Sequence, residues 1–180
     1  MNNGPKIITV FGTSKAEAGN AVFELAETVG RLLAENGFCL ANGGYGGTML
    51  AAAKGAAAAG GKVIGVTCRA FKRSRANEYI TEEVQTDSLA ERLAKLVVLG
   101  DGYLVLPGGT GTLLEAADVW EHKNKGFPNA DKPIILVGAF WQPLVSMMAA
   151  ADADSVVCVE CAETAEDAIE LLKTSLDVAL

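Results

Sequence analysis

The sequence predicts an α/β protein of the Rossmann-like type, an open parallel sheet with helices on both faces. Short runs of branched apolar residues alternate with longer segments whose apolar residues recur at helical spacing. Two glycine-rich turns each follow such a run and precede such a helix. Ligands of parallel sheets bind at the carboxyl ends of the strands, so both turns are expected there. At 180 residues, the chain is expected to form one domain over 1–180.

The first half of the chain predicts two strand-helix units and a third strand. Branched apolar residues indicate buried strands at 7–11, 38–41 and 62–67. Apolar residues recur at helical spacing over 21–35, and Asn36-Gly37 ends that helix. A helix of alanine and glycine follows the turn at Thr48 and reaches Gly60. Its small side chains imply close approach to a neighbouring element.

The second half continues the alternation. A short strand is predicted at 83–86, and Asp87 or Ser88 is a suitable N-cap for a helix over 89–99. Further strands are predicted at 103–106, 133–137 and 155–159. The remaining helices are predicted after residue 109 through Trp120, over 140–150 and over 165–176. This repeated alternation is typical of a parallel sheet covered on both faces.

Composition excludes several classes of protein. Half of the residues are hydrophobic and 21% are charged, which excludes intrinsic disorder. No apolar run is long enough to span a bilayer, and the N-terminus lacks the pattern of a secretory signal, so we expect a cytoplasmic protein without membrane contact. The formal net charge is 15 − 22 = −7, which argues against nonspecific nucleic-acid binding.

The four cysteines favour reduced thiols over a disulfide framework. Cys158 and Cys161 have CxxC spacing, but a zinc site would need a second pair of ligands, and the single histidine, His122, is far away in sequence. A redox CxxC usually opens a helix, whereas Cys158 lies in a strand-like run. We therefore interpret the pair as small buried residues at a strand end and expect no metal site.

The two glycine-rich turns indicate an anion site. The later turn contains Gly108, Gly109, Thr110, Gly111 and Thr112 after an apolar run, and glycine lets a ligand approach the backbone amides at the start of a helix. The earlier turn contains the residues Gly43, Gly44, Gly46, Gly47 and Thr48. Neither matches a dinucleotide fingerprint or a triphosphate P-loop, which makes NAD and ATP less favoured. A monophosphate held by amides and threonine hydroxyls fits better. Gly12, Thr13 and Ser14 form a further polar loop after the first strand.

Glu115 and Arg92 each have two interpretations on pattern alone. Thr112 and Glu115 have the spacing of a capping box, yet Glu115, Asp118 and His122 also form one polar stripe that faces either solvent or a cleft. Arg92 lies at the edge of an apolar stripe, where snorkelling is favoured over an anion site. The basic loop from Arg69 to Arg75 also has two interpretations that the sequence favours equally, a solvated surface and a loop that closes over an anionic ligand.

Residues 107–115 resemble the PGGxGTxxE signature of the LOG (Lonely Guy) family, the cytokinin-activating phosphoribohydrolases once labelled lysine decarboxylases. Residues 42–49 resemble the family's earlier glycine motif, Arg92 stands where an arginine precedes the signature, and the similarity covers roughly residues 6–150. The resemblance implies hydrolysis of the N-glycosidic bond of a nucleoside 5′-monophosphate such as AMP. It implies catalytic roles for Glu115 and Arg92, a second carboxylate at Asp118, phosphate and ribose binding by both glycine turns, no cofactor, and a homodimer.

Two departures point to a divergent, bacterial-type branch of that family. Leu93 follows Arg92 where plant-like members have lysine, and Tyr45 and Thr48 change the earlier glycine motif. Both put a preference for cytokinins in doubt. Relatives of this fold that bind nucleotides or a molybdenum cofactor make a noncatalytic carrier the alternative function. Lysine decarboxylation has little support, because no residue pattern marks a pyridoxal phosphate lysine.

Overall fold

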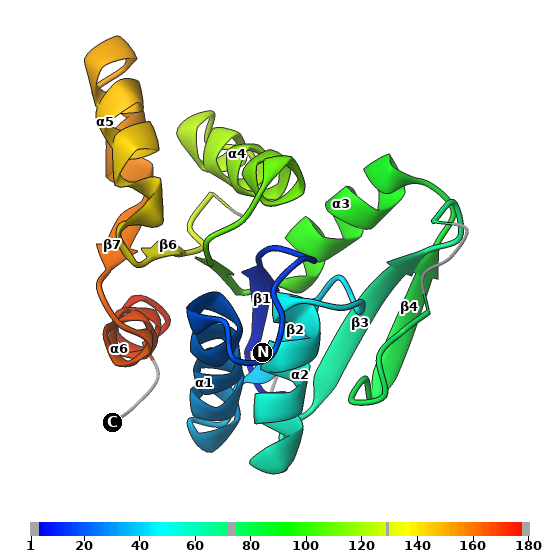
Figure 1. The fold of residues 1–180 in the computed structure, drawn as a ribbon. Helices are drawn as coiled ribbons and strands as arrows, with labels where there is room; N and C mark the ends of the chain where they lie inside the picture. Colours follow the sequence, from blue (N-terminus) through cyan, green and yellow to red (C-terminus); the bar gives the residue numbers. More distant parts are fainter. Residues whose placement is uncertain (1–3, 72–74, 129, 178–180) are drawn as a thin grey trace.

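The computed structural model describes residues 4–71, 75–128 and 130–177 and contains one parallel sheet between two layers of helices (Figure 1). The sheet has seven strands in the order β4-β3-β2-β1-β5-β6-β7. The strands are β1 (Ile7–Phe11), β2 (Cys39–Asn42), β3 (Val63–Cys68), β4 (Glu82–Thr86), β5 (Gly102–Val105), β6 (Ile134–Val137) and β7 (Glu160–Ala162). The α-helices are α1 (Ala21–Glu35), α2 (Thr48–Ala58), α3 (Leu89–Leu99), α4 (Thr110–Asn124), α5 (Gln142–Ala151) and α6 (Ala165–Ser175).

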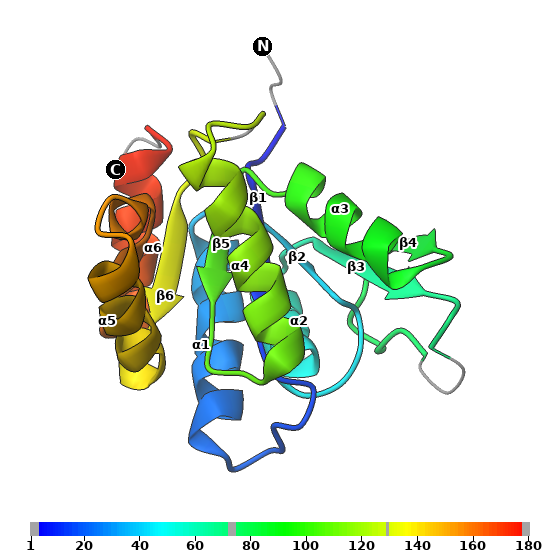
Figure 2. The ribbon, with the colours of Figure 1, turned by 90° about the horizontal axis from the view of Figure 1, so that it is seen from above.

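The helices cover both faces of the sheet, which confirms the predicted fold class. Helices α1, α2 and α6 pack on one face around residues such as Val29, Leu33 and Leu172. Figure 2 looks onto the opposite layer, where α3 and α4 pack around Leu96 and Val119. Each face therefore has its own apolar core.

Helices α1 and α2 pack backbone against backbone. A Cβ atom on Gly30 of α1 would collide with the carbonyl oxygen of Ala52, and one on Gly55 of α2 would collide with the carbonyl oxygen of Glu27. Ala51, Ala52 and Ala53 are fully buried. The close approach predicted from the alanine-rich sequence is confirmed, and no side-chain layer separates these two helices at the contact.

The predicted strand at 155–159 is wrong. Ser155–Cys158 forms a short 3₁₀ helix, η2, and β7 begins only at Glu160. The indole of Trp120 donates a 2.8 Å hydrogen bond to the Ser155 carbonyl, which anchors η2 against α4. A short apolar run does not by itself distinguish a strand from a helical turn, and here tertiary packing decides. Cys158 is consequently buried in η2, while Cys161 is exposed on β7 and not buried as predicted.

The other predicted elements are present, with most bounds within two residues. The exception is α4, which continues past Trp120 to Asn124. Within the described ranges, no helix combines the length and apolarity needed to cross a bilayer.

The order of the strands creates a crevice. From β1 the chain adds β2, β3 and β4 on one side of the sheet, and it adds β5, β6 and β7 on the other. The loops after the neighbouring strands β1 and β5 therefore diverge at the carboxyl edge. Such a switch in direction is where parallel α/β sheets bind ligands.

Candidate active site

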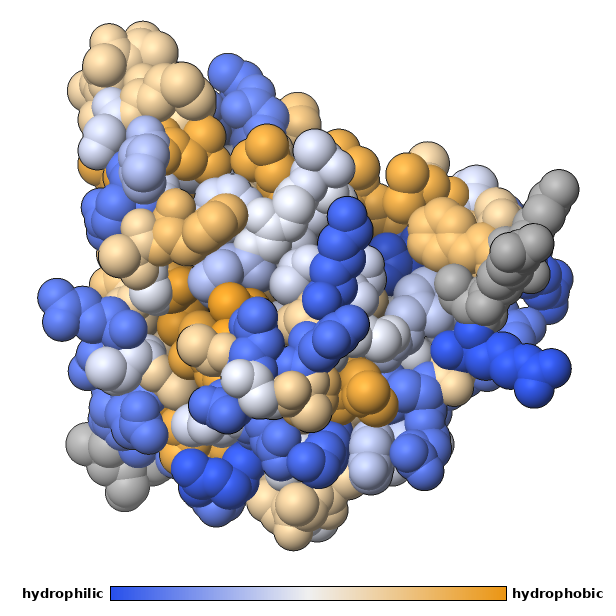
Figure 3. Space-filling view, viewed as in Figure 1, coloured by the Kyte–Doolittle hydropathy of each residue, from blue (hydrophilic) through white to orange (hydrophobic). Residues whose placement is uncertain are grey.

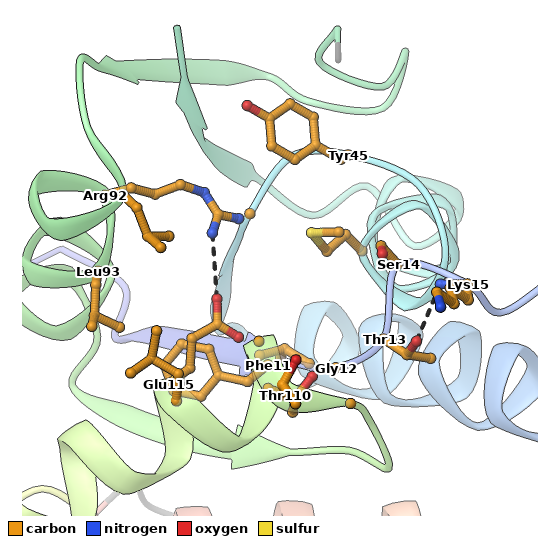
Figure 4. Close-up of a pocket in the computed structure, with 18 of the residues that line it drawn as sticks. Phe11, Gly12, Thr13, Ser14, Lys15, Tyr45, Arg92, Leu93, Thr110 and Glu115 are labelled. Carbon is orange, nitrogen blue, oxygen red and sulfur yellow. Dashed lines mark hydrogen bonds and ion pairs between the residues drawn. The ribbon is translucent and has the colours of Figure 1, made fainter. Parts of the chain in front are cut away.

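A cavity of about 700 Å³ lies at this switch point. Its walls come from the loops that follow β1, β2, β3 and β5, and from α3 and α4 (Figure 4). The lining residues are Val10, Phe11, Gly12, Thr13, Ser14, Lys15, Gly43, Tyr45, Met49, Phe71, Leu89, Arg92, Leu93, Gly109, Thr110, Gly111, Thr112, Leu114 and Glu115.

The later glycine turn opens directly onto the cavity. Helix α4 begins at Thr110, its N-cap is Gly109, and no side chain forms a capping hydrogen bond there. Thr110, Gly111 and Thr112, the first residues of the helix, line the cavity. The amides of a helix start favour an anion, so this turn remains the predicted anion site. Of the predicted residues in this turn, Gly108 alone is outside the lining, because it packs against the Thr112 side chain.

The capping-box interpretation of Glu115 is wrong. Thr112 is not an N-cap residue but lies within the first turn of α4, where its side chain is buried. The Glu115 carboxylate instead lies 3.4 Å from Nη1 of Arg92. Glu115 is thus directed into the cavity from the second turn of the helix.

The earlier glycine turn is closed. The amide and hydroxyl of Thr48 both donate to the carbonyl of Thr13, at 2.9 and 3.0 Å, so the loop after β1 caps the start of α2. Gly47, at φ +66°, allows this contact, because a Cβ there would collide with Thr13 and Ser14. Thr48 is buried, and Gly44, Gly46 and Gly47 join it outside the cavity lining. Of the predicted residues in this turn, only Gly43 lines the cavity.

The loop after β1 forms part of the wall. Gly12, Thr13 and Ser14 line the cavity together with Lys15, an exposed residue that the sequence prediction missed. The Thr13 hydroxyl accepts a 3.1 Å hydrogen bond from the Lys15 amide. The position of Lys15, directly after a strand and a polar turn, was the signal that could have identified it.

Arg92 is buried and does not snorkel, so the interpretation favoured by its pattern is wrong. Its side chain leaves α3 and crosses to β3, where Nε donates a 2.8 Å hydrogen bond to the Val66 carbonyl. The guanidinium lies 5.6 Å from the ring centre of Tyr45 and 5.8 Å from that of Phe71. Gly43 makes room for it, because a Cβ there would collide with Nη2 of Arg92. The guanidinium is therefore held on three sides.

Burial raises the pKa of Glu115 to about 7, although the positive charge of Arg92 acts in the opposite direction. The carboxyl side chain is 15% exposed, so little water stabilises its charged form. A carboxyl group with a pKa near neutrality can change protonation during a reaction, which is a common property of acid-base residues.

Asp118 and His122 do not share the cavity with Glu115. They line a second hollow of about 510 Å³, between α3 and α4, together with mainly apolar residues such as Leu93 and Phe127. The predicted polar stripe of α4 is therefore divided between two hollows. The role implied for Asp118 has no contact with the cavity to support it.

The basic loop contributes an aromatic ring to the cavity. Arg69 points to the surface, where it pairs with Asp87 at 3.1 Å, while Phe71 lines the cavity. Lys72 and Arg73 lie outside the described residues. Tyr45, which the sequence prediction also missed as a site residue, is fixed by the backbone of Cys68, whose amide donates to its hydroxyl at 2.7 Å. In the described ranges, no group of His, Cys, Asp and Glu side chains could hold a metal ion.

Comparison with known proteins identifies the family. The family model described as "Possible lysine decarboxylase" matches residues 49–174. The chain belongs to this family, the LOG family. A LOG-family relative from Rhodococcoides fascians, a cytokinin riboside 5′-monophosphate phosphoribohydrolase, is 33% identical over 147 residues, which make up 79% of this chain and 73% of the relative. A Mycobacterium tuberculosis protein of the same name is 37% identical over 118 residues, 64% of this chain and 62% of that protein.

Solved structures agree with this fold. The molybdenum cofactor binding protein from Rippkaea orientalis aligns over 98% of this chain and 99% of its own, with a TM-score of 0.79 and 24% identity. The molybdenum cofactor carrier protein from Chlamydomonas reinhardtii covers 96% and 99%, with a TM-score of 0.78 and 24% identity. In this chain the LOG signature, residues 107–115, runs from the end of β5 to the second turn of α4, so one segment supplies both the open helix start and Glu115.

Proposed function

We propose that this LOG-family chain hydrolyses the N-glycosidic bond of a nucleoside 5′-monophosphate and releases free base and ribose 5-phosphate. The observation that carries the proposal is the convergence of Arg92 and Glu115, 3.4 Å apart, in the cavity that also contains the open start of α4. The names of the R. fascians and M. tuberculosis relatives support the same reaction.

The spacing along α4 suits a nucleotide. From Thr110 to Glu115 the helix rises by roughly 7.5 Å, at 1.5 Å per residue. A 5′-phosphate bound to the amides at the helix start therefore leaves the ribose beside Glu115. The apolar and aromatic residues farther along the cavity, including Phe71 and Leu93, then face the base.

The chemistry needs a carboxylate at that place. As the bond between C1′ and the base nitrogen breaks, the ribose becomes oxocarbenium-like and positively charged. Ionised Glu115 stabilises that charge or orients the attacking water, whose hydroxyl joins C1′ while its proton goes to the departing base. Arg92 holds the carboxylate in position. Because only ionised Glu115 can do this, we expect kcat to rise with pH and to level off above about 7.

Incubation with AMP and related monophosphates tests the proposal by release of free base. Glu115→Gln should lower kcat by about a thousandfold or more, since it removes a charge that acts in the transition state. Glu121→Gln, an exposed residue of the same helix that pairs with Lys125, is the matched control and should retain activity. A wild-type protein that is inert across a broad nucleotide panel would exclude the proposal. An intact ligand retained through purification would favour the carrier alternative, and an aldimine absorbance band would favour lysine decarboxylation.

The proposal includes a homodimer that uses the α3-α4-α5 face. Val98 is 65% exposed and Phe127 is 50% exposed beside the hollow between α3 and α4, and α5 buries none of its residues although it carries no charge. Figure 3 shows apolar surface along this side of the molecule. Large apolar patches of this kind usually mark contacts, and the family resemblance implies a second copy as the occupant. Sedimentation equilibrium should give twice the chain mass, and Val98→Asp should give monomers; a monomeric wild type would exclude the dimer.

A further inference from the structure

We propose that Tyr45 and Phe71 are positioning residues, whose rings hold the Arg92 guanidinium at the place where it meets the carboxylate of the cavity. The inference rests on the proposed hydrolysis of nucleoside monophosphates, because it states which residues keep the two catalytic side chains of that reaction together. Three observations carry it: the geometry of the rings around the guanidinium, the few hydrogen bonds that hold the guanidinium itself, and the contacts that fix the rings.

The two rings and the guanidinium form a compact triangle. The central carbon of the Arg92 guanidinium lies 5.6 Å from the ring centre of Tyr45 and 5.8 Å from that of Phe71. The two ring centres are 5.8 Å apart, and their planes are tilted by 52°. The face of an aromatic ring attracts a cation within about 6 Å, and more strongly where water is excluded. Arg92 is only 7% exposed, so both rings stabilise its charge at this place.

Hydrogen bonds alone do not fix the guanidinium. Its Nε donates to the Val66 carbonyl at 2.8 Å, but the group could still pivot about this one bond. The contact of Nη1 with Glu115 is 3.4 Å long, which is long for a charge-assisted hydrogen bond. In Figure 4 the guanidinium lies between Tyr45 and Glu115. The rings therefore limit the pivot and determine where Nη1 meets the carboxylate.

Both rings are themselves fixed by the loop after β3. The Tyr45 hydroxyl accepts a 2.7 Å hydrogen bond from the Cys68 amide and donates one of 3.3 Å to the Cys68 carbonyl. The same carbonyl accepts the amide proton of Phe71 at 3.1 Å. On the backbone side, the amide group of Asn77 donates to the carbonyls of Gly44 and Tyr45, at 3.1 and 2.9 Å. A residue that positions another needs such support.

The protonation of Glu115 reports the position of Arg92. The charged side chains among the described lining residues are Lys15, Arg92 and Glu115. Burial raises the pKa of Glu115, and the charge of Arg92 lowers it. A guanidinium that moves away should therefore let this pKa rise further. Water that enters a space left by a removed ring would act in the opposite direction, because it would relieve the burial.

The test follows the Glu115 carboxyl carbon by NMR in ¹³C-labelled protein without substrate, and Glu115→Gln assigns its signal. We expect Tyr45→Leu to raise the pKa of Glu115 by about one pH unit, because the ring that holds Arg92 is lost. Tyr45→Phe keeps the ring and loses only the hydroxyl contacts, so it should titrate like the wild type. Tyr79→Leu is the control and should also titrate like the wild type, since Tyr79 packs against the core outside the cavity lining.

Kinetics with AMP should agree with the titration. Tyr45→Leu should lower kcat about tenfold with KM nearly unchanged, and should move the rise of kcat to higher pH. Tyr45→Phe should restore most of the loss. If the Tyr45→Leu chain does not fold, Phe71→Leu replaces it, because Phe71 is 36% exposed and its loss should move the pKa of Glu115 in the same direction.

Three results would overturn the inference. The first is a pKa of Glu115 that stays the same or falls in Tyr45→Leu and Phe71→Leu. The second is a Tyr45→Phe variant that behaves like Tyr45→Leu, which would assign the effect to the hydroxyl. The third is a rise in KM alone, which would mean that the ring contacts the substrate directly. If no nucleotide is hydrolysed, the proposed reaction fails, and the titration without substrate still decides the inference.

Discussion

The two glycine-rich turns have similar sequences, but one is closed by packing against the protein and the other is open to the cavity. The turn before α2 is closed, because the loop after β1 caps the helix start and its glycines allow protein to pack against protein. The turn before α4 is open, because no side chain caps the helix and its first residues, Thr110, Gly111 and Thr112, line the cavity. Glycine serves packing in the first turn, whereas in the second a Cβ on Gly109 or Gly111 would meet nothing within 4 Å. A glycine-rich turn followed by a helix therefore does not by itself identify an anion site.

The largest effect should come from the closed turn, at Gly47. Gly47→Ala places a Cβ against Thr13 and Ser14 at φ +66°, a backbone conformation that side chains rarely adopt. We expect the free energy of unfolding to fall by more than about 3 kcal/mol, measured by urea denaturation. Gly46→Ala is the control in the same turn, since its Cβ would meet open space, and an equal loss there would contradict the distinction.

Gly43→Ala should mainly impair the site. The new Cβ would lie 2.6 Å from the Met49 sulfur and would displace the Arg92 guanidinium from its place above the turn. We expect kcat/KM to fall about a hundredfold, equivalent to about 2.7 kcal/mol. Steady-state kinetics against Gly46→Ala checks this; equal activity of the two variants would show that the position of Arg92 is unimportant.

The carboxyl group of Glu115, on the helix that follows the open turn, should make the free energy of unfolding depend on pH. Burial raises the pKa of Glu115 from 4.5 to about 7, so folding favours its protonated form. That stabilising contribution is present below pH 4.5 and is lost as the pH rises through about 7. Relative to Glu115→Gln, the wild type should lose about 2 kcal/mol across this window, less than the roughly 3 kcal/mol to which the full change in pKa corresponds, because the carboxyl side chain is still 15% exposed. If the free energies of unfolding of the wild type and Glu115→Gln differ by the same amount at every pH, this prediction is wrong.

The smallest effect should come from the open turn. The Cβ of Gly111→Ala would meet nothing within 4 Å in the free protein, so the free energy of unfolding should change by less than about 0.5 kcal/mol. Bound phosphate would meet the added methyl group, and KM should rise by about tenfold. Thermal unfolding and kinetics together measure both quantities. A large loss of stability would mean that this turn also serves packing.

The sequence was sufficient to predict most of the fold. The spacing of the apolar residues and the positions of the turn residues located nearly every helix and strand. Buried parallel strands and amphipathic helices have strong local patterns. The strand predicted at 155–159 was wrong. The indole of Trp120, which is distant in sequence, anchors Ser155–Cys158 as a helical turn. No local pattern contains that information.

The candidate site was predicted less evenly. The open turn and Glu115 lie in one continuous segment, so the sequence motif identified both. Local spacing alone, however, favoured a capping role for Glu115. For Arg92, the helical pattern favoured snorkelling, because its contacts with Val66 and Glu115 come from other elements. Thr48 was expected to bind phosphate, yet its hydroxyl is used by Thr13. Such outcomes depend on which loops meet at the edge of the sheet.

The backbone contacts of Gly30 with Ala52 and of Gly55 with Glu27 hold α1 and α2 tightly together. Because backbone rests on backbone, there are no side chains at this contact that could rearrange to absorb a change in spacing. Thr48, at the start of α2, is in turn hydrogen-bonded to the Thr13 carbonyl in the loop after β1, which lines the cavity. We therefore expect a substitution at Gly30, far from the cavity, to disturb the cavity wall as well as the packing of the two helices.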